Sequence, residues 1–194
     1  MSSWAGSSRP GRGARGRLSV LLALLGGLLA AAPGASKVFL TVDEAVRLAF
    51  PQAKVERRTA FLTSEQLRRA RELAGAEVPS ALISYYSAVR DGQPVGTAWF
   101  DTHRVRTLPE TLMIVIDPQG RVARIEVSSF REPEEYMPRG AWYDQFRGKA
   151  LGPDLQIKRA IRPVTGATLT ARATTDAVRR VLALHRVLLG AAAP

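Results

Sequence analysis

The sequence predicts an α+β fold: an antiparallel twisted sheet of two hairpins plus edge strands, packed by a long C-terminal helix. Two turn signals, Asp91-Gly92 and Pro118-Gln119-Gly120, each lie between runs that are typical of strands, which indicates two hairpins. Near the C-terminus, apolar residues recur at helical spacing. The chain has 194 residues, and about 158 of them follow a predicted leader, enough for one domain with one core.

The first 36 residues are predicted to be a signal peptide. An apolar run from Leu18 to Ala32 follows a basic segment without acidic residues. The run is shorter than the ~20 residues that span a bilayer, and the small residues at 34–36 suit cleavage. We therefore expect export to the bacterial periplasm; an uncleaved signal would instead anchor the domain to the inner membrane. Cleavage would lower the net charge from +11 to +7, because it removes Arg9, Arg12, Arg15 and Arg17.

Residues 37–79 are predicted to form an N-terminal extension of helix, strand and helix. Thr41 can cap a helix from Val42 to Phe50, which has acidic residues in its first turn. A strand is expected over Lys54–Leu62. The run Thr63-Ser64-Glu65-Gln66 is a capping box for a second helix to Ala74, and Gly75 is its stop signal.

Residues 80–194 are predicted to form the main domain. The first hairpin takes residues 81–90 and 94–101, and the second takes residues 112–117 and 122–130. An edge strand is expected over Leu155–Ile161, and the closing helix over Thr168–Leu189. The helix carries a wide apolar stripe that should pack across the sheet: Ala177, Val178, Val181, Leu182, Leu184, Val187 and Leu188.

Composition excludes several kinds of site. The chain has no cysteine, which excludes disulfides, a thiolate nucleophile, iron–sulfur ligation and thioether-bound haem. His103 and His185 lie far apart without a ligand-spaced partner, so surface or structural roles are favoured over metal binding. The basic residues are scattered and form no nucleic-acid motif; a basic face would favour an acidic partner protein or peripheral contact with an anionic membrane.

The segment from Pro163 to Thr170 is the strongest candidate for a functional site. Two hydroxyl residues bracket Gly166-Ala167, and a helix follows at once. The free N–H groups and the dipole of a helix start favour an anion such as phosphate. A threonine-rich N-cap with a tight turn is the alternative. No nucleophile–base pair lies nearby, so the sequence gives little support to an exported hydrolase.

Aromatic residues gather before this segment. The run Ala141–Phe146 is expected to be a short helix with three aromatic residues, after a turn-rich stretch that includes Tyr136. Such residues could line a pocket for a planar ligand, and the alternative is that they close one end of the core.

The motif Thr165-Gly166-Ala167-Thr168 resembles the flavinylation motif of the FMN-binding domain family. That family includes the periplasmic C subunit of the sodium-translocating NADH:quinone oxidoreductase, the G subunit of the Rnf complex and the periplasmic domain of the regulator NosR. The resemblance implies that a flavin transferase joins the FMN phosphate to Thr168 through a phosphoester. It covers about Ser80–Leu189, and Thr170 would be the accompanying second threonine.

The resemblance also implies how the cofactor is held. The N–H groups from Leu169 onward would receive the phosphoester charge, with help from Arg172 one turn later. The isoalloxazine pocket would differ from that of the named subunits, because residues 130–136 depart from their Thr-Pro-Gly-Leu-like loop. Tyr136, Trp142 and Tyr143 are the candidates for that pocket.

The implied function is electron relay by an exported flavoprotein with covalent FMN, rather than the action of a stand-alone enzyme. The expected redox partner is a cytochrome or a membrane complex linked to quinone. The family usually has Asp three residues before the first hydroxyl of the motif, where this chain has Arg162. That departure keeps an alternative open: a periplasmic sensor or scaffold that retains the fold with weak or no flavin.

Overall fold

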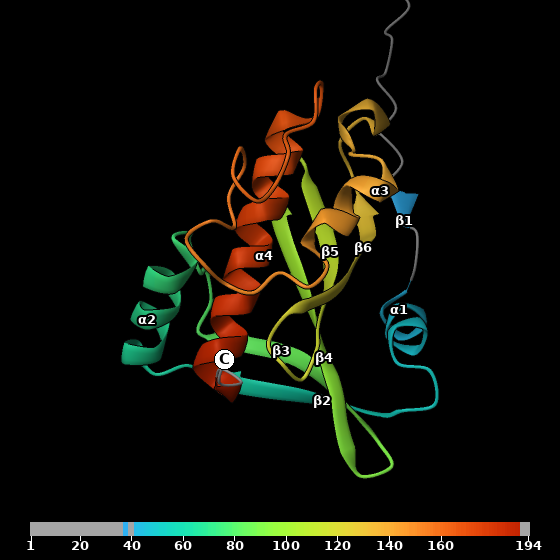
Figure 1. Cartoon of the computed structure of the whole chain (residues 1–194), viewed down its shortest axis with the longest axis vertical. Helices are drawn as coiled ribbons and strands as arrows, with labels where there is room; N and C mark the ends of the chain where they lie inside the picture. The colour runs from blue at the N-terminus through green and yellow to red at the C-terminus, as the bar shows by residue number, and fades with distance from the viewer. Residues whose placement is uncertain (1–36, 39–40, 191–194) are drawn as a thin grey trace, which may run out of the picture. The chain divides into compact units, whose positions relative to one another are not determined.

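The computed structural model describes residues 37–38 and 41–190, so the predicted signal peptide lies outside the described residues. One six-stranded sheet runs in the order β1-β6-β5-β4-β3-β2 (Figure 1). Every neighbouring pair is antiparallel, and the predicted α+β class is confirmed. The strands are β1 Lys37–Val38, β2 Lys54–Phe61, β3 Leu82–Arg90, β4 Gln93–Arg104, β5 Pro109–Ile116 and β6 Val122–Phe130.

The described helices have the local signals that the sequence predicts. Thr41 caps α1 and Thr63 caps α2, each in a complete capping box, and Gly75 ends α2 in a left-handed conformation with φ of 61°. The long C-terminal helix α4 has the predicted bounds. The helices are α1 Val42–Ala49, α2 Ser64–Ala74, α3 Gly140–Tyr143 and α4 Thr168–Leu189, with 3₁₀ turns η1 Glu134–Tyr136 and η2 Asp144–Phe146.

The alternation of side chains along β5 gives the sheet two buried faces. Leu112, Ile114 and Ile116 join the larger core, which contains the apolar stripe of α4. Met113 and Val115 point to the opposite face and join a smaller core with the buried side of α1. Figure 1 shows α4 lying along the sheet with α2 beside it. Both faces of the central strand are therefore shielded from solvent.

The edge strand predicted over Leu155–Ile161 is wrong. The described segment forms turns with one isolated bridge between Ile157 and Ile161. Leu155 and Ile161 are both buried in the larger core, and Lys158 has a left-handed φ of 68° between them. The side chains of Leu155 and Ile161 thus enter the larger core from a loop and not from a strand. The sheet edges are formed by β1 and β2 instead.

The N-terminal extension is built into the same sheet. Strand β2 pairs along its whole length with β3, and the chain after α2 leads directly into β3. The boundary near residue 79 stays a prediction. Among residues 37–38 and 41–190, no helix combines the length and apolar character that crossing a bilayer requires.

Candidate functional site

The predicted motif forms a tight turn that leads into α4. Gly166 has φ of 83°, and a side chain added there would meet nothing within 4 Å, so the approach to the turn is open. Thr168 is the first residue of α4; it is exposed, and its hydroxyl donates to the Val164 carbonyl at 3.1 Å. Ala167 is the N-cap and provides no side-chain cap. The start of a 22-residue helix is therefore available to an anion.

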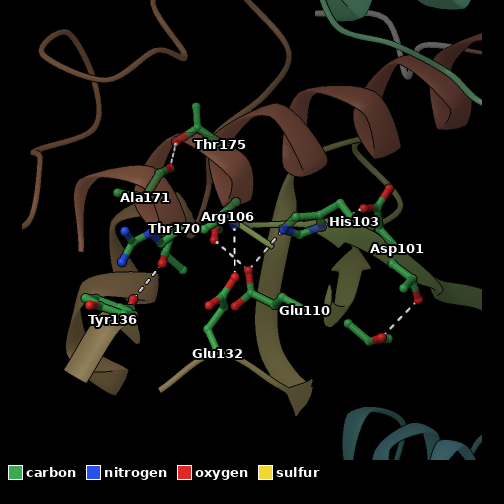
Figure 2. Close-up of polar contacts among 12 residues, drawn as sticks. Asp101, His103, Arg106, Glu110, Glu132, Tyr136, Thr170, Ala171 and Thr175 are labelled. Atoms are coloured by element: carbon green, nitrogen blue, oxygen red, sulfur yellow. Dashed lines mark hydrogen bonds and ion pairs between the residues drawn. The ribbon is translucent and has the colours of Figure 1, made fainter. Parts of the chain in front are cut away.

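A hollow of about 170 Å³ surrounds the motif. Its lining comes from three segments that are far apart in the sequence: Arg106, Tyr136 and residues 166–170. Thr170 is 1 % exposed, and its hydroxyl donates to the Tyr136 carbonyl at 2.5 Å, which ties η1 to the first turn of α4 (Figure 2). Thr170 is thus occupied by a structural bond, whereas Thr168 is open to solvent.

A buried carboxylate holds the loop that carries Arg106. Glu132 Oε1 accepts hydrogen bonds from the backbone N–H groups of Arg106, Thr107 and Leu108 at 3.2, 2.7 and 2.8 Å. Burial would raise the pKa of Glu132, but these bonds favour the charged form and lower the pKa below its usual value. The guanidinium of Arg106 consequently lies 4.6 Å from the centre of the Tyr136 ring, beside the motif (Figure 2).

A second, more polar hollow of about 260 Å³ adjoins the first, and Leu169 lines both. The predicted helper Arg172 lines this second hollow and is absent from the lining of the first. Arginines outnumber carboxylates in the lining, so the surface beside the motif is basic: His103, Arg104, Val105, Leu169, Arg172, Ala173, Asp176 and Arg180.

Beneath the second hollow, four charged side chains form a chain of alternating sign. Arg180 binds Asp101 through two bonds of 2.7 and 2.8 Å. His103 lies between two carboxylates, with Nδ1 2.9 Å from Asp101 Oδ1 and Nε2 3.0 Å from Glu110 Oε2 (Figure 2). Glu110 is fully buried, so each charge depends on its neighbours for compensation.

The network shifts the titration of its members. Burial would lower the pKa of His103, but the bonds and charges of Asp101 and Glu110 outweigh it and raise the pKa to about 9. Burial would raise the pKa of Asp101, yet the bonds from Arg180 and His103 lower it. The imidazole is therefore a cation at neutral pH. His103 thus links Asp101 to the fully buried Glu110.

Two of the three candidate aromatics lie in the core. Trp142 is 9 % exposed and its indole N–H donates to the Arg162 carbonyl at 2.8 Å. Tyr143 is 6 % exposed, and its hydroxyl donates to Glu110 at 3.4 Å. Of the three, Tyr136 lies beside the motif. The structure thus separates the aromatics that the sequence groups together.

Sequence reasoning missed Arg106, Glu132 and Glu110. The contact between Glu132 and the Arg106 loop joins residues 26 positions apart, so no local sequence pattern predicts it. The sequence around Glu110 contains a signal, because this acidic residue precedes the apolar run of residues 112–116. A buried partner for such a residue could have been expected.

The residues around Thr168 fit an esterified phosphate: an exposed hydroxyl, an uncapped helix start, open space over Gly166 and a nearby guanidinium. Within the described part of the chain, no group of three or more histidine, cysteine or carboxylate side chains is arranged to hold a metal ion.

Comparison with known proteins gives a match to a family model. Residues 108–183 match the family model described as the FMN-binding domain, a region that includes the motif, Glu110, Glu132 and most of α4. No curated protein and no solved structure matches the chain. The match supports FMN as the ligand and indicates a flavin-binding protein. Residues 108–183 are thus similar to the FMN-binding domain family.

Proposed function

We propose that FMN is joined through its phosphate to the hydroxyl of Thr168, and that the protein relays electrons as an exported flavoprotein. The observation that carries the proposal is the exposed Thr168 hydroxyl at the uncapped start of α4, inside the family match. In the attachment step, Oγ1 would attack phosphorus on an activated flavin nucleotide. It would form the P–O bond, lose its proton and displace the activating group, with catalysis by a flavin transferase.

The chain's own groups suit the product of that step. The phosphoester keeps one negative charge, which the free N–H groups of the first turn of α4 and the Arg106 guanidinium can stabilise. The basic hollow next to it, which shares Leu169, supplies further positive charge. When bound, FMN supplies the electron-transfer chemistry, and the protein holds and orients it. The basic surface favours an acidic redox partner, such as a cytochrome or a quinone-linked membrane complex.

The test is production of the full chain together with a flavin transferase, followed by a denaturing gel viewed under ultraviolet light and by intact mass. We expect a fluorescent band, and a mass increase equal to one FMN phosphoester. Thr168→Ala should abolish both, whereas Thr59→Ala, which removes an exposed hydroxyl outside the motif and its hollow, should retain a flavin band. A band that persists in Thr168→Ala would refute the attachment site. No band with several transferases would refute covalent attachment.

The second candidate is a periplasmic sensor or scaffold that binds flavin weakly or not at all. The observation that favours it is Arg162, an exposed cation where the family usually has an acid. Protein that stays colourless after production with several transferases would support this candidate over the first. The mass of the exported protein would also report whether the predicted signal peptide is removed.

A further inference from the structure

A third hollow lies at the opposite end of α4 from the motif. Its volume is about 480 Å³, in the range of roughly 300–1,000 Å³ that is typical of small-molecule sites. Thr168 and His185 are seventeen residues apart on one helix, which places the two sites about 25 Å apart. The lining comes from the end of α4, from β2, β3 and β4 and from the β5–β6 turn: Arg58, Tyr85, Ser87, Ala88, Val89, Pro94, Gly96, Thr97, Asp117, Pro118, His185, Leu189 and Gly190.

His185 is the polar group of this hollow that has no partner among the described residues. It is 8 % exposed and makes no hydrogen bond with them. It follows Val181, Leu182 and Leu184 on the apolar stripe of α4, where a leucine would pack without polar atoms. The ring nitrogens are not among the enclosed polar atoms that lack a partner, so they stay within reach of the hollow that His185 lines. A ligand in the hollow can therefore exchange a hydrogen bond with the ring.

The inner wall of the hollow is aromatic. Tyr85 stacks on Trp99 with ring centres 4.6 Å apart and planes 12° apart, and the His185 ring meets the Trp99 edge at 6.2 Å. The indole N–H of Trp99 already donates to the Thr97 hydroxyl at 2.8 Å. Tyr85 and His185 both line the hollow. Tyr85 contributes a flat aromatic ring and His185 contributes ring nitrogens that can form a hydrogen bond. This combination suits a planar ligand.

The charges around the hollow disfavour an ionic ligand. Arg58 shares the Glu56 carboxylate with Lys54, at 2.5 and 3.0 Å, so positive charge remains on this side of the hollow. On the other side, the Asp117 carboxylate accepts two backbone N–H bonds of 2.9 Å. Burial lowers the pKa of His185, with a smaller opposing effect from Asp117, so the ring is neutral near pH 7. An anion would face Asp117 and a cation would face Arg58.

We infer that this hollow is a second binding site, separate from the flavin motif, for a neutral planar aromatic molecule of about two fused rings that exchanges a hydrogen bond with His185. Neither its lining nor its charges involve the motif, so the inference stands whether or not FMN is attached to Thr168.

The test uses three probes of one shape with the full chain: 2-naphthol, naphthalene and 2-naphthoate. Titration calorimetry should give the tightest binding for 2-naphthol, with naphthalene weaker by several-fold to about tenfold, the value of one hydrogen bond. The anion 2-naphthoate should bind weakest. Equal binding of all three probes, or binding of none, would overturn the inference.

The location of the probe can be read from the two histidines. The chain contains only His103 and His185, so ring-labelled histidine gives two sets of NMR signals. We expect 2-naphthol to shift the signals of His185 and to leave those of His103, at the other end of the sheet, unchanged. Binding that shifts His103 instead would place the probe elsewhere and overturn the assignment.

Variants separate a ligand site from a structural role. His185→Phe should remove the preference for 2-naphthol over naphthalene while retaining an aromatic ring. Should that variant fail to fold, Val89→Trp, at the exposed rim of the hollow, should block all three probes. Leu82→Trp is the matched control, because Leu82 is exposed on the same strand and lies outside the lining. Blocking by both tryptophans, or by neither, would contradict the site.

Discussion

At the scale of single residues, this protein depends on a few polar side chains whose partners are distant in sequence. Glu132 fixes the backbone that carries Arg106, and Thr170 fixes the backbone that carries Tyr136. Both bonds converge on the turn that exposes Thr168. Hydrogen bonds therefore fix the two segments beside the turn, while the Thr168 hydroxyl itself is exposed.

Replacing Glu132 tests the first of these supports. In Glu132→Ala, the N–H groups of residues 106–108 lose their acceptor, and we expect a loss of about 1–3 kcal/mol in the free energy of unfolding. Glu132→Gln keeps one acceptor oxygen without the charge and should cost less. Urea denaturation of the two variants measures the difference; equal losses would show that packing rather than hydrogen bonding matters at this position.

Replacing Arg162 tests the departure from the family pattern. Its backbone N–H is bound by Gln145 and its carbonyl by Trp142, while the side chain is exposed, so Arg162→Asp should fold normally. If the acid assists recognition by the transferase, the fraction of protein that carries FMN should rise by several-fold, as read from intact mass. Arg159→Asp makes the same charge change at a nearby exposed position and should leave the fraction unchanged. An equal rise in both variants would indicate a general effect of charge.

At the scale of elements, capping residues fix where α1 and α2 begin, and packing against the sheet fixes where the helices lie. The capping boxes of α1 and α2 are complete, whereas the start of α4 has no side-chain cap. In α1 and α2, threonine hydroxyls accept hydrogen bonds from N–H groups of the first turn. In α4, the first N–H groups have no side-chain acceptor and lie beside the hollow at the motif.

The cap of α2 gives a direct test of this contrast. Thr63→Ala removes the acceptor of the Gln66 N–H and should lower the free energy of unfolding by about 1 kcal/mol, whereas Thr63→Ser should be nearly neutral. The proposed attachment of FMN to Thr168 should be unaffected by either change. Thermal or urea unfolding measures the cost, and an equal loss in both variants would point to the threonine methyl group instead of the cap.

At the scale of the whole molecule, one sheet supports two cores and a buried ionic chain that joins β4, β5 and α4. Arg180, Asp101, His103 and Glu110 alternate in sign, so the chain can be buried without net charge. Such networks are sensitive to the loss of any member, because a lone buried charge remains. The stability of the fold should therefore depend on pH.

His103 sets the direction of that dependence. Its pKa is about 9 in the folded protein and 6.5 in an unperturbed histidine, so its stabilising effect is complete below pH 6.5 and is lost as the pH rises through 9. The loss should reach about 3 kcal/mol at most. Urea unfolding between pH 6 and 10 should show this decline, and His103→Gln should flatten it. A decline of the same size in the variant would assign it to other groups.

Much of the fold could be predicted because its signals are local. Turn residues marked both hairpins, capping residues marked α1 and α2, and the apolar stripe gave α4 from Thr168 to Leu189. The segment 155–161 failed for the opposite reason: its apolar residues have strand-like spacing, but their burial comes from turns. A short apolar pattern does not distinguish a strand from a loop that folds into a core.

The sequence by itself determined the α+β class, the capped starts of α1 and α2, the bounds of α4 and the motif at Thr165–Thr168, since each depends on local residue patterns. The tertiary structure decided which distant residues surround that motif. It placed Arg106 and Tyr136 beside Thr168, moved Trp142 and Tyr143 into the core, and set His103 between two carboxylates. The physical reason is that buried polar groups must find partners wherever the fold brings them, and sequence distance does not limit that choice.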